Sequence, residues 1–331
     1  MLQILLFTVN SILPVILLAV IGYFLKCIGF FKADFLKAAN RTVFYLCLPV
    51  LLFKNIADIE DISEIRFDVI IYALLVIAAL YVTGLLLSLT VSDPKQKGVI
   101  HQCIFRSNFA LIGVPLAELM AGAEGVRAAA VLSLFSIPTF NILAVLVLSI
   151  YKGGKVKIDV KKILLDVCKN PLIIGVLLGL VFSLVKQLTI KSGLANPLSE
   201  LTFFSTTISY ISRAATPLAL LVLGGQFDLK RISGYKKQLI IGVFGRNIVA
   251  PVIGVGIACV LTLKGILNFT PAIFASLISL FGTPVAVASA IMADAMDNDG
   301  QLAGQLVVWT SFLSMGTLFI IIFTVKSLGL L

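Results

Sequence analysis

The sequence predicts an all-α integral membrane protein with ten transmembrane helices, built as two inverted five-helix repeats whose fourth and ninth helices are broken and cross. Three observations predict this fold. The 331 residues are 60% hydrophobic and only 13% charged, with a mean hydropathy of +1.10, whereas soluble domains are about half apolar and a quarter charged. The apolar residues fall into ten spans, and two of these spans contain matching Gly-x-Pro interruptions.

Each apolar span holds roughly 20 residues, the helix length that crosses ~30 Å of hydrocarbon. The first span has no Lys or Arg before Lys26 and exceeds the apolar region of a cleaved signal peptide, so we expect a retained helix. In chain order, the spans cover residues 4–25, 42–57, 68–91, 98–121, 126–151, 170–189, 200–224, 238–262, 270–293 and 303–325.

The segments between the spans predict the orientation in the membrane. Those after the first, third, fifth and seventh spans hold 16 Lys and Arg residues, against 7 on the opposite side. Because basic loops stay in the cytoplasm, both termini are predicted to be extracytoplasmic in a multi-pass protein of the cell membrane. The segment after the ninth span does not fit this orientation, because it is predicted to be cytoplasmic but has Asp294, Asp297 and Asp299 and no Lys or Arg. Acidic residues weigh little in this rule, so the predicted orientation stands.

The two halves of the chain show signs of duplication. Gly113-Val114-Pro115 and Gly282-Thr283-Pro284 lie 169 residues apart, and Pro49 and Pro217 lie 168 residues apart. Five spans per half is an odd number, so two homologous halves must lie upside down relative to one another. The predicted division is residues 1–151 for the first repeat, 152–165 for a basic cytoplasmic linker and 166–331 for the second repeat.

The residues around the breaks resemble a known family. Residues 108–116 contain Asn-x4-Gly-x-Pro followed by a small-residue turn at residues 121–123, and residues 283–293 and the Arg246-x4-Pro251 pattern fit the same comparison. Together they resemble the bacterial branch of the auxin efflux carrier family, within the superfamily of bile acid sodium symporters and auxin carriers. The resemblance extends over the whole chain in length and number of spans.

This resemblance implies a secondary active or facilitative transporter that works by an elevator mechanism. A scaffold would come from spans 1, 2, 6 and 7, a transport domain from spans 3–5 and 8–10, and a homodimer would form through the scaffold. Family substrates include malate-like and malonate-like organic anions and the weak acid auxin. The central loop is far shorter than that of long-looped plant carriers, which favours a small metabolite anion over auxin.

Helix polarity at the breaks independently favours an anion. Pro115 and Pro284 are expected at the first positions of new half-helices, whose free N–H groups and partial positive charge suit a carboxylate. The half-helix C-termini present carbonyls that suit Na⁺ or a proton-bearing group. Coupling to H⁺ or Na⁺ is therefore left open, and no cofactor is expected.

Asn108 is the favoured substrate ligand, because five helical residues place it about 7.5 Å from Gly113. Its alternative role is to satisfy backbone groups freed by the break. The second half is unequal, because residue 277 is Leu at the corresponding place, flanked by Ser276 and Ser279. The predicted substrate-binding residues are Ser107, Asn108, Gly113, Val114, Pro115, Asn141, Ser276, Ser279, Thr283 and Pro284.

Most of the remaining polar residues within spans have two possible roles. Arg106 either draws anions inward or snorkels to the interface, and Arg246 either lies on the substrate path or pairs with Asp228. Gln305, like Asn141, either contacts substrate or ion or joins two helices by a hydrogen bond. A structural tie is the expected role of Arg213.

Other functions find little support in the sequence. The five cysteines contain no C-x-x-C pair and His101 is the single histidine, so no zinc cluster is expected. Residues 297–300 fail as a calcium loop, because Ala295 and Leu306 would occupy ligand positions. The chain lacks H-E-x-x-H, G-x-S-x-G and phosphate-loop motifs, so no enzyme activity is predicted.

Other functions have weaker support in the sequence than a carrier for small organic anions. A bile-acid-type sodium symporter would need a cluster of acidic residues, whereas only Glu118 and Asp294 lie near the breaks. An auxin-like weak-acid exporter remains open, and a channel would need a filter sequence that is not seen. The net charge of +10 comes from short loops rather than a patch interleaved with aromatics, so no nucleic acid is expected as a partner.

Overall fold

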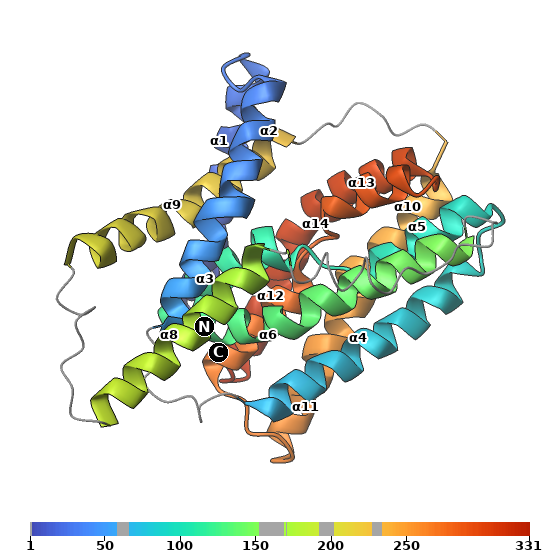
Figure 1. Cartoon of the computed structure of the whole chain (residues 1–331). Coiled ribbons are helices and arrows are strands. Elements are labelled where there is room, and N and C mark those ends of the chain that lie inside the picture. The colour runs from blue at the N-terminus through green and yellow to red at the C-terminus, as the bar shows by residue number, and fades with distance from the viewer. Residues whose placement is uncertain (1, 58–65, 152–168, 170, 192–201, 227–233) are drawn as a thin grey trace.

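The computed structural model describes residues 2–57, 66–151, 169, 171–191, 202–226 and 234–331 (Figure 1). Along these residues the chain is helical and forms no sheet, which confirms the all-α prediction. The helices are α1 (Leu2–Cys27), α2 (Ala33–Thr42), α3 (Leu48–Ala57), α4 (Phe67–Ser88), α5 (Pro94–Phe105), α6 (Val114–Tyr151), α8 (Pro171–Lys191), α9 (Thr202–Gln226), α10 (Lys236–Phe244), α11 (Ile257–Leu263), α12 (Pro271–Gly282), α13 (Ala288–Ala295) and α14 (Gly300–Ser327).

Helical residues occupy part or all of each of the ten predicted spans. Six helices of the described chain are long and apolar enough to cross a membrane, and three shorter apolar helices accompany them. Two of the spans are divided by unwound stretches, residues 106–108 after α5 and residues 283–287 between α12 and α13. The predicted linker at residues 152–165 lies outside the described residues.

Four short π-helical segments extend these helices. They are η1 (Val43–Cys47), η3 (Phe109–Gly113), η4 (Gly245–Val249) and η5 (Val252–Gly256). A π-helical turn contains about one residue more than an α-helical turn, so it rotates the side chains that follow around the helix axis. Such segments are frequent at functional sites. Here η3 begins directly after the first break, and η4 carries Arg246.

The small-residue turn predicted at residues 121–123 is confirmed as a sharp kink within α6. Ala121 has φ −140° and ψ 18°, and Gly122 has a φ of 57°, in the left-handed region that glycine adopts without strain. The kink divides α6 into the end of the broken fourth span and the whole predicted fifth span.

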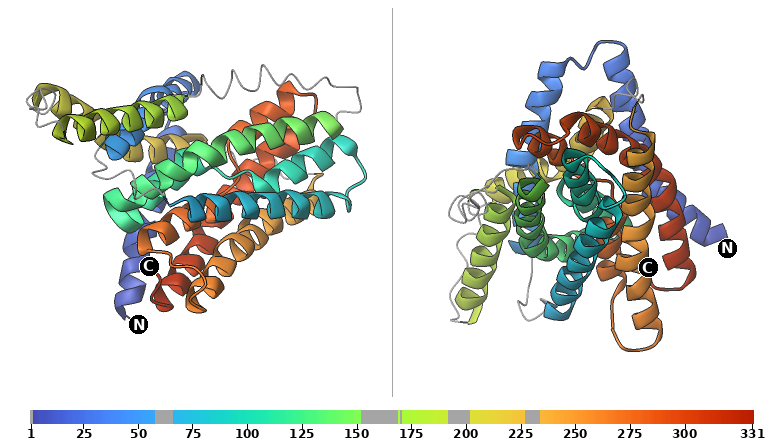
Figure 2. Two further views of the ribbon diagram at one scale, coloured as in Figure 1. Left: turned by 60° about the horizontal axis from the view of Figure 1, so that its bottom comes forward. Right: turned by 90° about the vertical axis from the view of Figure 1, so that its right-hand side faces the viewer.

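The helices of the first, second, sixth and seventh predicted spans pack in two pairs, α1 with α9 and α3 with α8. Glycine permits the close approach: a Cβ added at Gly22 would overlap the carbonyl of Leu221, and one at Gly175 would overlap the carbonyl of Pro49. In Figure 1, α8 and α9 extend to the left of α1, while α4, α5, α10, α13 and α14 gather at the right. The left view of Figure 2 shows α8 and α9 beside the blue segments of α2 and α3.

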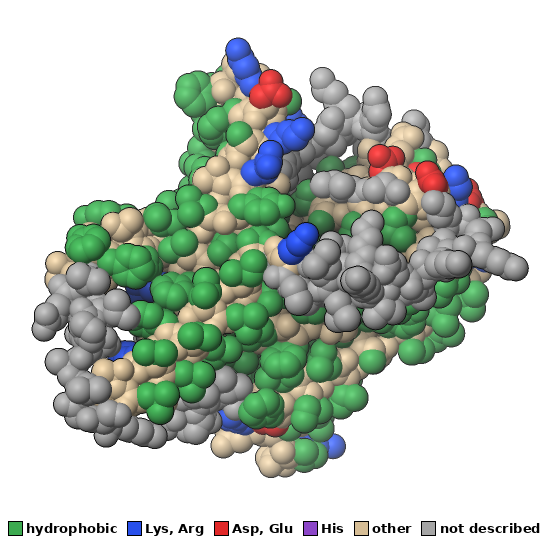
Figure 3. Space-filling model, viewed as in Figure 1, with side chains coloured by type: hydrophobic (Ala, Val, Ile, Leu, Met, Phe, Trp, Pro, Cys, Tyr) green, Lys and Arg blue, Asp and Glu red, His purple; other side chains and the backbone are tan. Residues whose placement is uncertain are grey.

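The surface is apolar where a membrane protein contacts lipid. Leu75, Ile240 and Ile320 are 64–69% exposed, together with many other large apolar side chains. Figure 3 shows these side chains across the middle of the visible face, with most charged side chains toward its upper and lower margins. Soluble monomers rarely expose such extended apolar surface, so the exterior fits a multi-pass membrane protein.

Candidate functional site

The two broken spans cross at their unwound stretches, residues 106–108 and residues 283–287. Arg106 and Thr283 have extended backbone, and the two stretches lie antiparallel to each other. Two backbone hydrogen bonds join them and together form the antiparallel bridge between Ser107 and Val285: the Asn108 N–H donates to the Pro284 carbonyl at 2.7 Å, and the Ala286 N–H donates to the Arg106 carbonyl at 3.3 Å. Backbone groups freed by one break are thus satisfied by the other, as unwound backbone at membrane depth requires.

The start of each new half-helix differs from the predicted position. Pro115 is the second residue of α6, but helical structure already begins at Phe109 in η3. The prediction that Pro284 opens a half-helix is wrong: it lies in the extended stretch, and α13 begins at Ala288. The reason is the crossing itself, because the Pro284 carbonyl is held by the Asn108 N–H, which favours extended rather than helical backbone.

Gly113 is required by close packing between the first break and α12. A Cβ at this position would lie 2.9 Å from the carbonyl oxygen of Ser279 and would also meet the ring of Phe109. A backbone oxygen cannot move aside as a flexible side chain can. Glycine therefore sets how closely the two broken spans approach.

A cavity of about 180 Å³ lies at the crossing. Of the predicted site residues, Arg106, Ser107, Asn108 and Asn141 line it together. The start of η3 at residues 109–111 and the start of α13 also line it, with apolar walls from three further side chains: Phe44, Ile137 and Phe140. These apolar residues were not predicted, because an aromatic or aliphatic residue in an apolar span carries no signal that distinguishes a cavity wall from core.

Arg106 brings a positive charge to this cavity. Its side chain is buried, with the residue 6% exposed, so it does not snorkel along a lipid-facing surface. One guanidinium nitrogen donates to Asn141 Oδ1 at 2.8 Å, and another contacts the sulfur of Met292. No carboxylate of the described residues forms an ion pair with Arg106. A buried charge without a counter-ion is costly, so the cavity is suited to a ligand that supplies the negative charge.

Further donors surround the same space. The hydroxyl of Ser107 and the side-chain amide nitrogen of Asn108 are buried and have no hydrogen-bond partner among the described residues. The first N–H groups of a helix also lack intrahelical acceptors and carry a partial positive charge, and two half-helices begin at the cavity, at Phe109 and Ala288. This arrangement can hold a carboxylate from several sides.

The other predicted residues lie near the crossing but away from the cavity wall. The hydroxyls of Ser276 and Thr283 donate to carbonyls of their own helix, at 2.8 Å each. The Ser279 hydroxyl is buried without a partner among the described residues. None of the following lines the cavity: Gly113, Val114, Pro115, Ser276, Ser279, Thr283, Pro284, Arg246 and Gln305.

The partners of Arg246 among the described residues are backbone carbonyls. Its guanidinium is fully buried and donates only to backbone carbonyls at the ends of α5 and α12. The acceptors are Ile104 at 3.0 Å, Leu280 at 3.3 Å, Phe281 at 2.7 Å and Thr283 at 2.9 Å. Asp228, its predicted partner, lies outside the described residues, and the Arg213 side chain is exposed.

The acidic segment before α14 has structural contacts. Asp299 caps this helix by accepting from the Leu302 N–H at 2.9 Å, and it also accepts from the Tyr235 hydroxyl at 3.3 Å. Burial, and then the Asp299 carboxylate, raise the pKa of Tyr235, which keeps the phenol protonated as a donor. Among the described residues, no group of three or more His, Cys, Asp or Glu side chains is placed to hold a metal ion.

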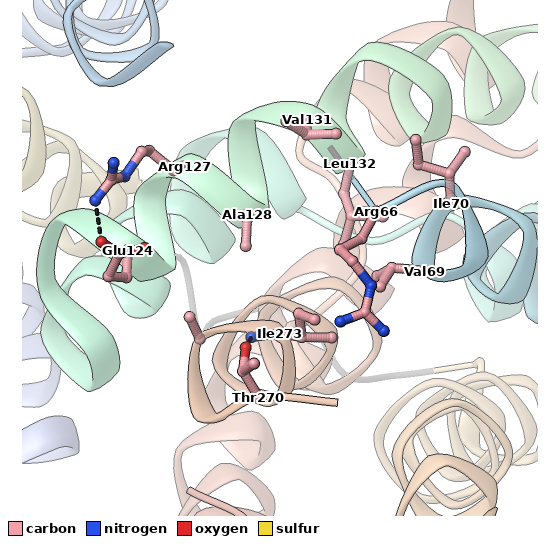
Figure 4. A pocket seen from close by; sticks show the side chains of 11 residues that line it. Arg66, Val69, Ile70, Glu124, Arg127, Ala128, Val131, Leu132, Thr270 and Ile273 are labelled. Atoms are coloured by element: carbon pink, nitrogen blue, oxygen red, sulfur yellow. Dashed lines mark hydrogen bonds and ion pairs between the residues drawn. The ribbon is translucent and has the colours of Figure 1, made fainter. Parts of the chain in front are cut away.

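A second cavity, of about 320 Å³, is lined by Arg66, Arg127, Glu124 and Thr270 (Figure 4). Although it is larger, both of its arginines have acidic partners: Arg66 pairs with Asp68 at 2.7 Å, and Arg127 pairs with Glu124. It contains none of the predicted site residues. The smaller cavity at the crossing is therefore the candidate site, because its arginine, Arg106, has no acidic partner among the described residues.

Comparison with known proteins agrees with a membrane role. A family model described as "Membrane transport protein" matches residues 7–322. The chain is 28% identical over 267 residues to an uncharacterized transporter of Methanocaldococcus jannaschii, covering 78% of this chain and 81% of the relative. It is 25% identical over 322 residues to an uncharacterized transporter of Methanothermobacter thermautotrophicus, covering 93% and 95% of the two chains.

Proposed function

The chain belongs to the auxin efflux carrier family of membrane transport proteins, and from this premise we propose that it carries a small organic anion whose charge is bound by Arg106. The observation that supports the anion is the buried guanidinium at the crossing, which has no acidic partner among the described residues and faces a cavity bounded by two half-helix N-termini. A neutral or cationic substrate would leave that positive charge unmatched.

The size of the cavity favours a mono- or dicarboxylate of the size of malate. At about 180 Å³ it is smaller than the ~300–1,000 Å³ of pockets that take drug-sized ligands. A bile-acid-type substrate would need a larger space, and an auxin-like weak acid is the less favoured alternative. Glu118, one of two acids near the breaks, accepts a hydrogen bond from Thr216 at 2.5 Å and does not line the cavity.

We further propose ten membrane crossings in two inverted repeats. In such a duplication the first span corresponds to the sixth (α1 to α8), and the second span corresponds to the seventh (α3 to α9). A contact between α1 and α9 should then have a counterpart between α8 and α3, and both contacts are present. In this arrangement the protein lies in the cell membrane with both termini outside and forms a homodimer through the scaffold.

The position of the cavity supports an elevator mechanism. Its wall combines Phe44, from a proposed scaffold span, with Arg106 and Asn108, from the proposed transport domain. Sliding of the transport domain past the scaffold would carry the bound anion across while the scaffold wall changes. The proposed activity is transport, with no enzymatic step and no cofactor.

Uptake into proteoliposomes tests the proposal. Labelled monocarboxylates, dicarboxylates, amino acids and aromatic acids would be compared with and without Na⁺ and a pH gradient. We expect saturable uptake of small carboxylates. Saturable transport of neutral or cationic solutes alone would overturn the assignment of an anionic substrate.

A further inference from the structure

Arg246 connects the two broken spans and does not line the cavity at the crossing. It lies in η4 and reaches two different helix ends: one terminal nitrogen donates to the Ile104 carbonyl near the end of α5, and the other nitrogens donate to carbonyls at the end of α12. The residue is completely buried. All of its partners among the described residues are backbone oxygens, so helix ends hold the charge there.

Such helix ends are negative. The last carbonyls of a helix have no intrahelical donor, and the aligned peptide dipoles give each C-terminus about half an elementary negative charge. Two C-termini that meet at a break in a membrane therefore form a site for a cation. In transporters with discontinuous helices, carbonyls of this kind bind the coupling Na⁺ or H⁺.

We propose that the guanidinium of Arg246 is a built-in cation that occupies the position at which these carbonyls would otherwise bind a coupling ion, so that transport by this chain does not require Na⁺. The statement that transport does not require Na⁺ rests on the proposed transport function. The statement that Arg246 is a fixed cation in a carbonyl site concerns only the folded protein.

The shape of the guanidinium explains why arginine occupies this position. Its planar fork has five N–H donors, and four hydrogen bonds to carbonyls of two helices use all three nitrogens. An ammonium group is a compact point charge with three donors and does not reproduce the fork. Arg246 thus neutralises both C-termini and fixes their separation at the same time.

The two arginines of the crossing have separate tasks for the same reason. Arg106 is the C-cap residue of α5, but it lines the cavity together with the starts of two half-helices at Phe109 and Ala288. Arg246 lies at the C-termini and does not line the cavity. The anion site is therefore left free while the cation site is already filled.

Removal of the guanidinium should convert this position into a site for a free cation. In Arg246→Ala the carbonyls of α5 and α12 lose their donors but stay buried, and a small cation that enters can replace the lost bonds. The experiment compares the melting temperatures of wild type, Arg246→Ala and Arg246→Lys in choline, K⁺, Na⁺ and sub-denaturing guanidinium at equal ionic strength. Arg127→Ala, at a partly exposed ion pair, is the control.

We expect Arg246→Ala to melt several degrees below wild type in choline and to recover in guanidinium or Na⁺. Wild type, Arg246→Lys and Arg127→Ala should be indifferent to the cation. If Arg246→Ala is recovered as folded protein only when prepared with one of these cations, the proposal is supported. Failure of every cation to restore it would overturn the carbonyl-site assignment.

Uptake measurements on wild type and Arg246→Ala test this inference separately from the proposed function. Wild type should transport its anion equally in Na⁺ and choline. Uptake by Arg246→Ala in choline should fall by at least about tenfold, because four charge-assisted hydrogen bonds are lost and the loss of one alone corresponds to about that factor. Wild-type uptake that requires Na⁺ would refute the inference. Absence of anion uptake under all conditions, with cation-dependent melting intact, would refute the proposed function and leave the built-in cation established.

Discussion

Replacement of Arg106 by glutamine should lower substrate affinity without unfolding the protein. A hydrogen bond to a charged group contributes about 1.5–3 kcal/mol, and about 1.4 kcal/mol corresponds to a tenfold change in affinity. Loss of the guanidinium therefore predicts an affinity roughly 10- to 150-fold weaker. Glutamine is the informative substitute, because its amide can still donate to Asn141 Oδ1 while the positive charge is removed.

The stability of the Arg106→Gln variant distinguishes a ligand-binding charge from a structural one. Arg106 has no acidic partner among the described residues, so its removal leaves no buried carboxylate unpaired. We expect a melting temperature equal to or above that of the wild type without substrate, because an uncompensated buried charge is lost. A structural ion pair would give the opposite result, a loss of about 3–5 kcal/mol.

The assay is equilibrium binding of the best carboxylate from the uptake panel, together with the KM of uptake and a melting curve. Arg127→Gln is the matched control, since this arginine lines the other cavity and pairs with Glu124. Its affinity should remain that of the wild type. A folded Arg106→Gln protein with unchanged affinity would refute the role of the guanidinium in binding.

Three further predictions concern the crossing and the orientation. Asn108→Ala should weaken binding by a smaller factor than Arg106→Gln, because one neutral donor is lost; an unchanged dissociation constant would remove this residue from the site. Gly113→Ala should lower both melting temperature and uptake because its methyl group meets a backbone oxygen of α12, whereas Gly256→Ala, with open space around it, should be tolerated. In a cysteine-free background, an impermeant thiol reagent added outside intact cells should label Lys264→Cys and not Lys95→Cys; the reverse pattern would invert the orientation.

Local features of the sequence predicted the breaks and the turn. The Gly-x-Pro motifs mark the two broken spans, but only the second unwound stretch contains its motif's proline, Pro284. The first stretch, residues 106–108, ends five residues before Gly113, so the motif predicts which span is broken and not where it unwinds. The kink at Gly122 is a local feature, because its left-handed φ of 57° is a property of one residue. The crossing was predicted because each half of the chain contains one break.

The partners of the arginines could not be predicted from spacing. Arg106 was equally compatible with an interfacial position, because its burial depends on which helices cover the first break. Arg246 was expected near an acid or the substrate, but its acceptors are carbonyls of helices more than 30 positions away in the chain, a distance of 34 residues for Leu280. Every residue has a carbonyl, so no sequence pattern marks these acceptors. Pro284 was misplaced because the contact that keeps it extended comes from the other half.

The two arginines also affect whether the transport domain moves faster with or without bound substrate. The two helix C-termini at Arg246 supply about one elementary negative charge between them, so that guanidinium is compensated whether or not substrate is bound. Arg106 has no acidic partner among the described residues, and a bound anion would compensate its charge. The loaded transport domain thus carries less uncompensated charge past the apolar scaffold than the empty one, and its movement should be faster. Unlabelled substrate inside proteoliposomes should therefore accelerate uptake of labelled substrate from outside. Equal initial rates with empty and preloaded vesicles would contradict this argument, and Arg106→Gln should abolish the difference, because removal of the charge equalises the two forms.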